Sequence, residues 1–159
     1  MSESPEPSPA RIVADADVLA ADLLVGGASR RALDHVRSHS WLELAASDAL
    51  LDDAEAVVAE LADPALAADW RERAAALRTP VDHPAGDHPA LASAYHGGAM
   101  HVLTLDRRLL GARAGMHLRG RMDVSVRSPD AFDAVFDAES LYGAVVGGDY
   151  PGPDRDPRG

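Results

Sequence analysis

Hydrophobic positions follow two different periods along the chain, and the alternation of these periods predicts the fold. Short runs that are apolar on both faces, as in buried parallel strands, occur at residues 11–15 and 101–105. Between them, apolar residues recur at helical spacing, most clearly over residues 48–62. Strands that alternate with helices predict an α/β fold, a three-layer α/β/α sandwich with a mainly parallel central sheet.

The expected elements and their flanking segments divide the chain into one domain and two tails. The domain covers residues 11–146, with disordered tails expected at 1–10 and 147–159, which are rich in proline, glycine and acidic residues. Residues 79–86 are expected to form a loop, and residues 107–121 a glycine-punctuated basic segment. Strands are predicted at 11–15, 41–46, 101–105 and 123–127, and helices at 16–24, 29–39, 48–62, 64–77, 88–96 and 131–142.

The composition restricts the compartment and the kinds of site. The chain has no cysteine, which excludes disulfides and thiolate metal sites. No apolar run approaches the roughly 20 residues that span a bilayer, and the N-terminal residues lack the features of a signal peptide, so we expect a cytoplasmic protein without a membrane partner. The net charge is -11 and all 15 basic residues are arginine, which favours a halophilic source in which an acidic surface keeps proteins soluble.

Positive charge is concentrated in one segment of this acidic chain. Six arginines and one acid lie between residues 107 and 127, so this segment carries +5 and the rest of the chain -16. A basic strip of this kind can follow a nucleic-acid backbone. The alternative is a solvated loop with arginines near helix C-termini, and the sequence does not choose between them. Among the histidines, only His88, beside an aspartate, is a candidate for a functional role.

Three aspartates occupy positions where a carboxylate can face a ligand. Asp15 and Asp106 follow two of the predicted strands, and Asp87 stands at the start of the predicted helix 88–96. Ligands of parallel sheets bind beyond the carboxyl ends of the strands. Carboxylates crowded at one edge repel one another unless a cation neutralises them, and oxygen ligands suit Mg²⁺ or Mn²⁺. Taken singly, each aspartate has a simpler explanation as a helix or turn cap.

A fourth carboxylate is expected from the helix at 48–62. At about 100° per residue, Asp52 points nearly opposite the apolar face of that helix, whereas Asp53 lies on its edge. A carboxylate that faces a site between packed elements is therefore expected to be Asp53, with Asp52 as the adjacent alternative.

The ordered set of these motifs resembles the PIN-domain ribonucleases. It comprises Ile12-Val13-Ala14-Asp15-Ala16-Asp17-Val18-Leu19, Ser47-Asp48-Ala49-Leu50-Leu51-Asp52-Asp53, Asp87 with Leu91, Ala92 and Ala94, Val102-Leu103-Thr104-Leu105-Asp106, and Val126 with Ser128, Pro129 and Phe132. The resemblance covers about residues 11–137, and each motif alone is short and degenerate.

The resemblance implies a PIN-like fold and a Mg²⁺- or Mn²⁺-dependent endoribonuclease with four acidic positions. Asp15, Asp87 and Asp106 match the first, third and fourth positions and are the implied metal ligands. Asp53 offers the second, which is usually glutamate in the family. Asp17 and Thr104 fall where the family has small polar residues, and they are expected to orient the ligands.

The implied chemistry needs no nucleophilic side chain. A metal ion binds a phosphate oxygen and lowers the pKa of a water molecule, and Arg107 and Arg108 are expected to hold RNA phosphates nearby. The resemblance also suggests an antitoxin protein or a second copy of the chain as partners. Two alternatives stay open: a PIN-like binding module without catalysis, and a flavodoxin-like or receiver-like regulator, which the absence of lysine disfavours.

Overall fold

The central element is a six-stranded sheet with the strand order β3-β2-β1-β4-β6-β5. The structure, a computed structural model, describes residues 6–112, 115–118 and 122–158. All neighbouring strands are parallel except β5, which is antiparallel to β6. The strands are β1 (Ser8–Ala14), β2 (Glu43–Ser47), β3 (Thr79–Val81), β4 (Ala99–Leu103), β5 (Gly115–Leu118) and β6 (Met122–Arg127).

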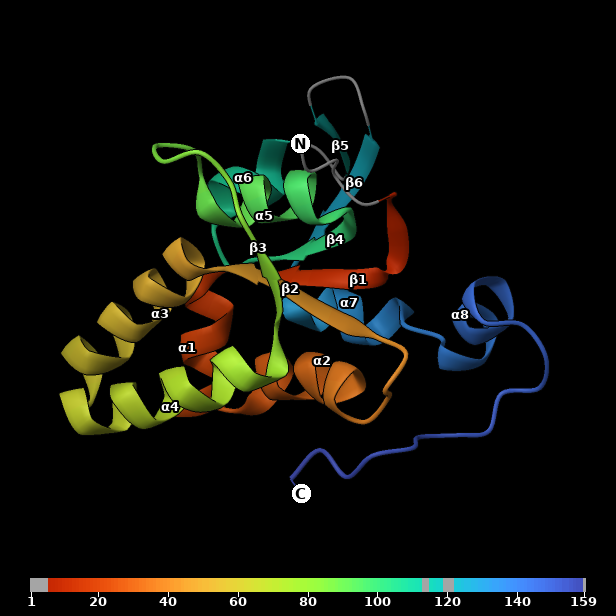
Figure 1. The fold of residues 1–159 in the computed structure, drawn as a ribbon, viewed down its shortest axis with the longest axis horizontal. Helices are drawn as coiled ribbons and strands as arrows, with labels where there is room; N and C mark the ends of the chain where they lie inside the picture. The colour runs from red at the N-terminus through yellow and green to blue at the C-terminus, as the bar shows by residue number, and fades with distance from the viewer. Residues whose placement is uncertain (1–5, 113–114, 119–121, 159) are drawn as a thin grey trace.

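Helices cover both faces of this sheet. In Figure 1, α5 and α6 lie on the upper side of the sheet, whereas α1, α2, α4 and α7 lie below it. The prediction of an α/β/α sandwich with a mainly parallel sheet is confirmed. The helices are α1 (Ala16–Leu24), α2 (Gly27–Arg37), α3 (Asp48–Leu61), α4 (Pro64–Leu77), α5 (Pro89–Gly97), α6 (Arg107–Ala112), α7 (Pro129–Val135) and α8 (Ala138–Val145).

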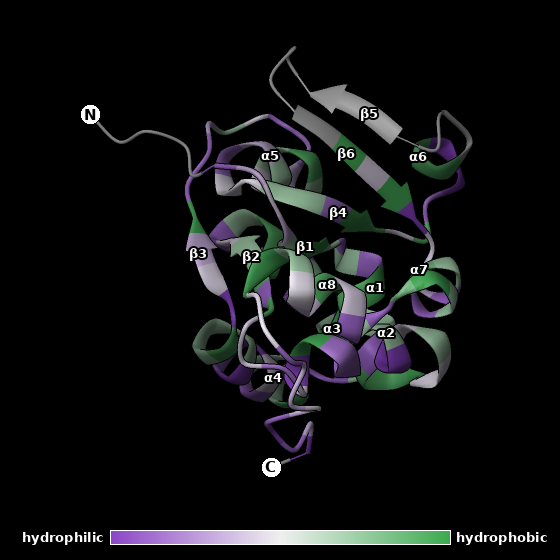
Figure 2. Cartoon of the chain, turned by 90° about the vertical axis from the view of Figure 1, so that its right-hand side faces the viewer, coloured by the Kyte–Doolittle hydropathy of each residue, from purple (hydrophilic) through white to green (hydrophobic). Residues whose placement is uncertain are grey.

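The core lies where the two central strands meet the helices. Val13 pairs in register with Val102, and Ala14 with Leu103. The valine and leucine side chains among these are fully buried, because helices shield both faces of the parallel strands. In Figure 2, hydrophobic colouring gathers on the central strands and hydrophilic colouring on the outer helix surfaces. None of the helices in the described ranges is both long enough and apolar enough to cross a membrane.

Three predicted segments differ from the structure in kind. In the basic segment 107–121, for which no helix or strand was predicted, the structure has α6 and the strand β5, which is antiparallel to β6. Residues 79–86, predicted as a loop, begin with the short strand β3, which is an edge strand and therefore tolerates Pro80. The predicted helix 131–142 is instead two helices, α7 and α8. The break occurs because the Asp137 side chain accepts a hydrogen bond from the Ser140 N–H and caps a new helix.

The segments expected to be disordered tails make specific contacts where the structure describes them. Ser8 begins β1, so the sheet extends into the expected N-terminal tail. In the C-terminal segment, the N–H groups of Asp154 and Arg155 donate to the Ser38 carbonyl. The hydroxyl of Tyr150 lies 2.6 Å from Nε2 of His39, a buried side chain. The C-terminal segment therefore packs against the end of α2.

Candidate functional site

Asp15 and Asp106 follow adjacent parallel strands at the same edge of the sheet. Asp15 comes directly after β1, and its N–H donates to the Leu103 carbonyl of β4 at 2.8 Å. Asp106 follows β4 by three residues and begins α6, accepting hydrogen bonds at its carbonyl from the N–H groups of Leu109 and Leu110. The register of β1 and β4 thus brings two segments that lie far apart in the sequence to one edge.

The buried hydroxyl of Thr104 joins these two segments. Its Oγ1 donates to Oδ2 of Asp15 at 2.9 Å and accepts from the Asp106 N–H at 3.0 Å. The other oxygen of Asp15, Oδ1, accepts from the Ala16 N–H at 2.8 Å and so caps α1. Asp15 therefore serves as a cap while also facing this edge, and each of its oxygens keeps a second lone pair for another partner.

Asp17, in the first turn of α1, faces the same edge. Its carboxylate accepts from the Leu105 N–H at 3.2 and 3.3 Å. Burial raises the pKa of Asp17, and the negative charges of Asp15 and, less strongly, Asp106 raise it further, against the lowering effect of backbone hydrogen bonds. The three carboxylates therefore share one region of negative potential.

Asp106 is the member of this group with a cationic partner. The pKa of Asp106 is lowered, chiefly because Oδ1 accepts from the Arg108 N–H at 2.9 Å, and also because the Arg108 guanidinium lies 3.4 Å away. A smaller lowering comes from His88, the N-cap residue of α5. Arg108 is 92% exposed and can move away from this pairing without disturbing the core. Arg107 is exposed as well.

Asp87 precedes α5 but is not its N-cap residue, the position that the capping explanation gave it. It is half-buried just before α5, and the N-cap residue of that helix is His88, which makes no side-chain cap hydrogen bond. The electrostatic effect of His88 on Asp106 places the start of α5 beside the carboxyl edge.

The prediction that Asp53 rather than Asp52 faces a site between packed elements is not supported. Asp53 is exposed, five residues into α3 and so about 7.5 Å along the helix axis from its start at the end of β2. Asp52 is the one that faces a neighbouring element, because it pairs with Arg71 of α4 at 2.5 Å. Helical periodicity located the apolar face of α3 but not the position of α4 beside it.

The carboxylates fit a hydrated cation better than a cage built of protein atoms. Within the described ranges, no group of three or more histidine, aspartate or glutamate side chains is arranged to hold a metal ion. Mg²⁺ commonly keeps several waters and binds through only one or two carboxylates. Asp15 supplies hard oxygen donors, and a cation bound at this edge would offset the repulsion by Asp15 that, after burial, raises the pKa of Asp17.

Sequence reasoning missed a second group of charged residues, which lies among the helices below the sheet in Figure 1. Arg30, Arg37 and Arg73 line a cavity between α1, α2 and α4. The signal in the sequence is Asp22, which interrupts the apolar face of α1. The structure buries this carboxylate, and a buried carboxylate requires a cationic partner. That partner is Arg37.

Comparisons with known proteins give a family but no activity. No curated protein and no solved structure matches the chain. One family model, described as a family of unknown function (DUF7384), matches residues 6–158. The chain therefore belongs to the DUF7384 family of unknown function.

Proposed function

We propose that this protein is a Mg²⁺- or Mn²⁺-dependent endoribonuclease of the PIN type, with its active site at the carboxyl edge of β1 and β4. The observation that carries the proposal is the convergence of carboxylates at this edge, where the Thr104 hydroxyl hydrogen-bonds to Asp15 and to the Asp106 N–H and the Leu105 N–H hydrogen-bonds to Asp17. The pKa of Asp17 is raised accordingly, by its burial, by the charge of Asp15 and, less strongly, by that of Asp106 from a distant part of the sequence. Repulsion of this kind is costly in a fold unless it serves a cation or a titrating group.

The residues of the edge have separable roles in this proposal. Asp15, Asp87 and Asp106 would hold a hydrated ion, in part through its water molecules, and the ion when bound would supply a polarised phosphate oxygen and a water of lowered pKa. Thr104 orients Asp15 through the 2.9 Å hydrogen bond and positions the backbone of Asp106 through the 3.0 Å one. Asp17 adds negative charge beside them.

Substrate binding would fall to the exposed arginines of α6. Arg107 and Arg108 follow Asp106 directly, so a phosphate bound by their guanidinium groups lies beside the carboxylates. Arg108 would exchange its contact with Asp106 for an RNA phosphate, which frees Asp106 for the cation. RNA as the substrate also favours a cytoplasmic location. An antitoxin protein and a second copy of this chain are proposed as further partners on the PIN resemblance alone.

The decisive experiment is cleavage of single-stranded RNA with Mn²⁺ added or removed by chelation. We expect Mn²⁺-dependent cleavage by the wild-type protein that disappears in Asp15→Asn and in Asp106→Asn. Asp63→Asn is a matched control, because Asp63 caps α4 far from this edge and an asparagine oxygen also caps. Cleavage that survives both changes at the edge would refute the proposed site.

A second candidate function is a PIN-like binding module without catalysis. It is favoured by the exposure of Asp53, which leaves the second acidic position of the family without a residue that faces the site. Such a module would bind RNA or a protein partner in the presence of a chelator, and its affinity would be the same in Asp15→Asn. A nuclease would lose turnover in that variant.

A further inference from the structure

A cavity of about 440 Å³ lies between α1, α2 and α4. Its wall combines polar and apolar groups in similar measure, and the apolar part includes Leu19, Leu33 and Trp70, with Leu44 of β2 at the sheet side. The helices α1, α2 and α4 all lie below the sheet in Figure 1, so the cavity is on the opposite face from α5. A volume of this size with a partly apolar wall is typical of sites for small organic molecules.

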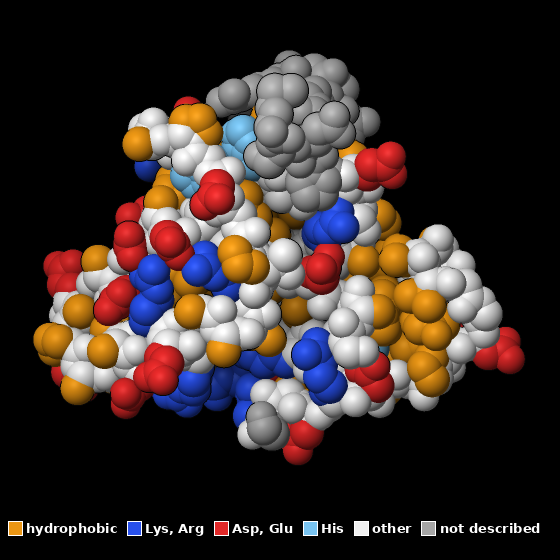
Figure 3. All heavy atoms as spheres, in the orientation of Figure 1, with side chains coloured by type: hydrophobic (Ala, Val, Ile, Leu, Met, Phe, Trp, Pro, Cys, Tyr) orange, Lys and Arg blue, Asp and Glu red, His pale blue; other side chains and the backbone are white. Residues whose placement is uncertain are grey.

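The mouth of the cavity is strongly cationic. Arg30, Arg37, Arg73 and Arg158 line it, and Asp22 is the one acid among the lining residues that the structure describes. Figure 3 shows arginine side chains gathered along the lower edge of the molecule, over the region between α4 and α2. The positive charge is notable because the whole chain carries -11.

Two of these arginines are already neutralised by carboxylates. Arg37 pairs with Asp22 and also with Asp34 at 2.9 Å, and Arg158 pairs with Asp34 at 2.7 Å. The side chain of Asp22 is buried, so its pair with Arg37 is a structural one. These contacts do not neutralise Arg30 or Arg73.

Among the described residues, Arg30 and Arg73 have no carboxylate partner. Arg30 donates to the Asp22 and Leu23 carbonyls at 2.9 and 3.3 Å, which holds its guanidinium at the C-terminal end of α1. The guanidinium of Arg73 makes one long contact, 3.5 Å, with the Asp69 carbonyl of its own helix. Both side chains therefore keep donors for an anion.

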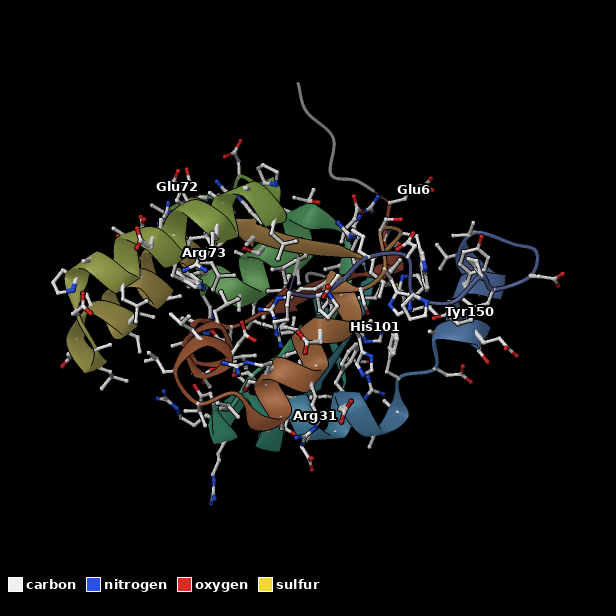
Figure 4. The ribbon with its side chains drawn as sticks, turned by 90° about the horizontal axis from the view of Figure 1, so that it is seen from below. Glu6, Arg31, Glu72, Arg73, His101 and Tyr150 are labelled. Atoms are coloured by element: carbon white, nitrogen blue, oxygen red, sulfur yellow. The ribbon has the colours of Figure 1, made fainter. Side chains whose placement is uncertain are left out.

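The orientation of α4 brings Arg73 to the cavity and keeps its acidic neighbour away. Figure 4 shows Arg73 on the side of α4 that faces α1, whereas Glu72 lies on the outer side of the helix. Successive residues of a helix point about 100° apart, so Glu72 does not compete with a ligand for Arg73.

We propose that this cavity binds a small organic anion, with a carboxylate or phosphate head between Arg73 and Arg30 and an apolar body against Trp70. Guanidinium groups bind both kinds of head through paired hydrogen bonds. A cavity left by imperfect packing would need no cations at its mouth, and a solvated basic surface would have no apolar wall. A site that has both cations and apolar wall groups suits an acid with an apolar body.

This site is separate from the proposed nuclease site. The cavity meets α1 at Leu19, Asp22 and Leu23, from the middle of the helix toward its C-terminal end, whereas Asp15 and Asp17 stand at its N-terminal end. Binding in the cavity is therefore expected without Mn²⁺ and in Asp15→Asn.

The test is calorimetric titration of the full chain with octanoate, octyl phosphate and octanol at constant ionic strength. We expect at least one of the two anions to bind, and octanol, which has the same apolar body, to bind at least about tenfold more weakly. A tighter octanoate would identify a carboxylic acid as the natural class, and a tighter octyl phosphate a phosphate ester.

Two arginine variants show whether the anion lies in the cavity. Arg73→Gln should weaken anion binding about tenfold, and it is not expected to unfold the protein because Arg73 is exposed. The matched control is Arg31→Gln, since Arg31 lies on the side of α2 toward α7, pairs with Asp133 and does not line the cavity. Absence of binding by both anions, octanol that binds as tightly as they do, or equal affinities in Arg73→Gln and wild type would overturn the proposal.

Discussion

The hydroxyl of Thr104 is the single group on which the geometry of the carboxyl edge depends most. The side chain is fully buried, donates to Asp15 and receives the Asp106 N–H. Thr104→Val keeps the shape of the side chain and removes both hydrogen bonds. A hydrogen bond to a charged group contributes about 1.5–3 kcal/mol and a neutral one about 1 kcal/mol.

Partial exposure of the aspartates reduces this sum. Asp15 and Asp106 are only half-buried, so water replaces part of what the valine variant loses. We therefore expect Thr104→Val to lower the free energy of unfolding by about 2 kcal/mol in metal-free buffer at neutral pH. Thr104→Ser keeps the hydroxyl and loses one buried methyl group, which costs about 1 kcal/mol.

The two variants differ more sharply in metal binding. Loss of a group that orients a ligand commonly weakens metal affinity about 10- to 100-fold, so Thr104→Val should bind Mn²⁺ that much more weakly while Thr104→Ser stays near wild type. Denaturant unfolding measures the stabilities and calorimetry the affinities. A valine variant as stable as wild type, or one that binds Mn²⁺ equally well, would refute the role given to the hydroxyl.

Two further predictions concern the charge and the packing of the fold. Because the pKa of Asp17 is raised above 3.8, its stabilising contribution is complete below that pH and is lost as the pH rises through the folded-state value. Asp17→Asn should therefore raise the free energy of unfolding at pH 7 without metal. Denaturant unfolding at several pH values measures this, and a variant less stable than wild type at pH 7 would contradict the prediction. A Cβ on Gly97 would meet Val81 of β3 at 2.8 Å, so Gly97→Ala should destabilise by about 1–3 kcal/mol. Gly143 lies in α8, where an added Cβ would meet nothing within 4 Å, so Gly143→Ala should be neutral or slightly stabilising. Thermal unfolding of the two alanine variants measures the difference.

The elements that a local pattern defines were predicted from the sequence. Continuous apolar runs located β1 and β4, and the parallel arrangement of these strands then placed Asp15 and Asp106 at one edge. These inferences need only two things: a hydrophobic pattern that can be read within a few residues, and the rule that parallel strands end at the same edge of the sheet.

What the sequence did not predict depends on how elements are oriented against one another. The exposure of Asp53 and the pairing of Asp52 follow from the angle between α3 and α4, which no periodicity of α3 contains. The cavity exists because α1, α2 and α4 leave a space below the sheet. The strand β3 is too short and too rich in proline to show a strand pattern, and its pairing with β2 defines it.

The docking of the C-terminal segment shows a similar limit. Its composition is typical of disorder, yet Asp154 accepts a hydrogen bond from the Ser40 N–H at 2.7 Å, and the guanidinium of Arg155 donates to the His39 carbonyl at 2.9 Å. These contacts are between positions more than 100 residues apart, where composition carries no information.

The most direct test of the account is calorimetric titration of Mn²⁺ into the metal-free protein, because a cation site at the carboxyl edge is its central claim. We expect one Mn²⁺ site in the wild-type protein, lost or weakened at least about tenfold in Asp15→Asn and unchanged in Asp63→Asn. No Mn²⁺ binding by the wild-type protein, or the same affinity in Asp15→Asn, would contradict the claim.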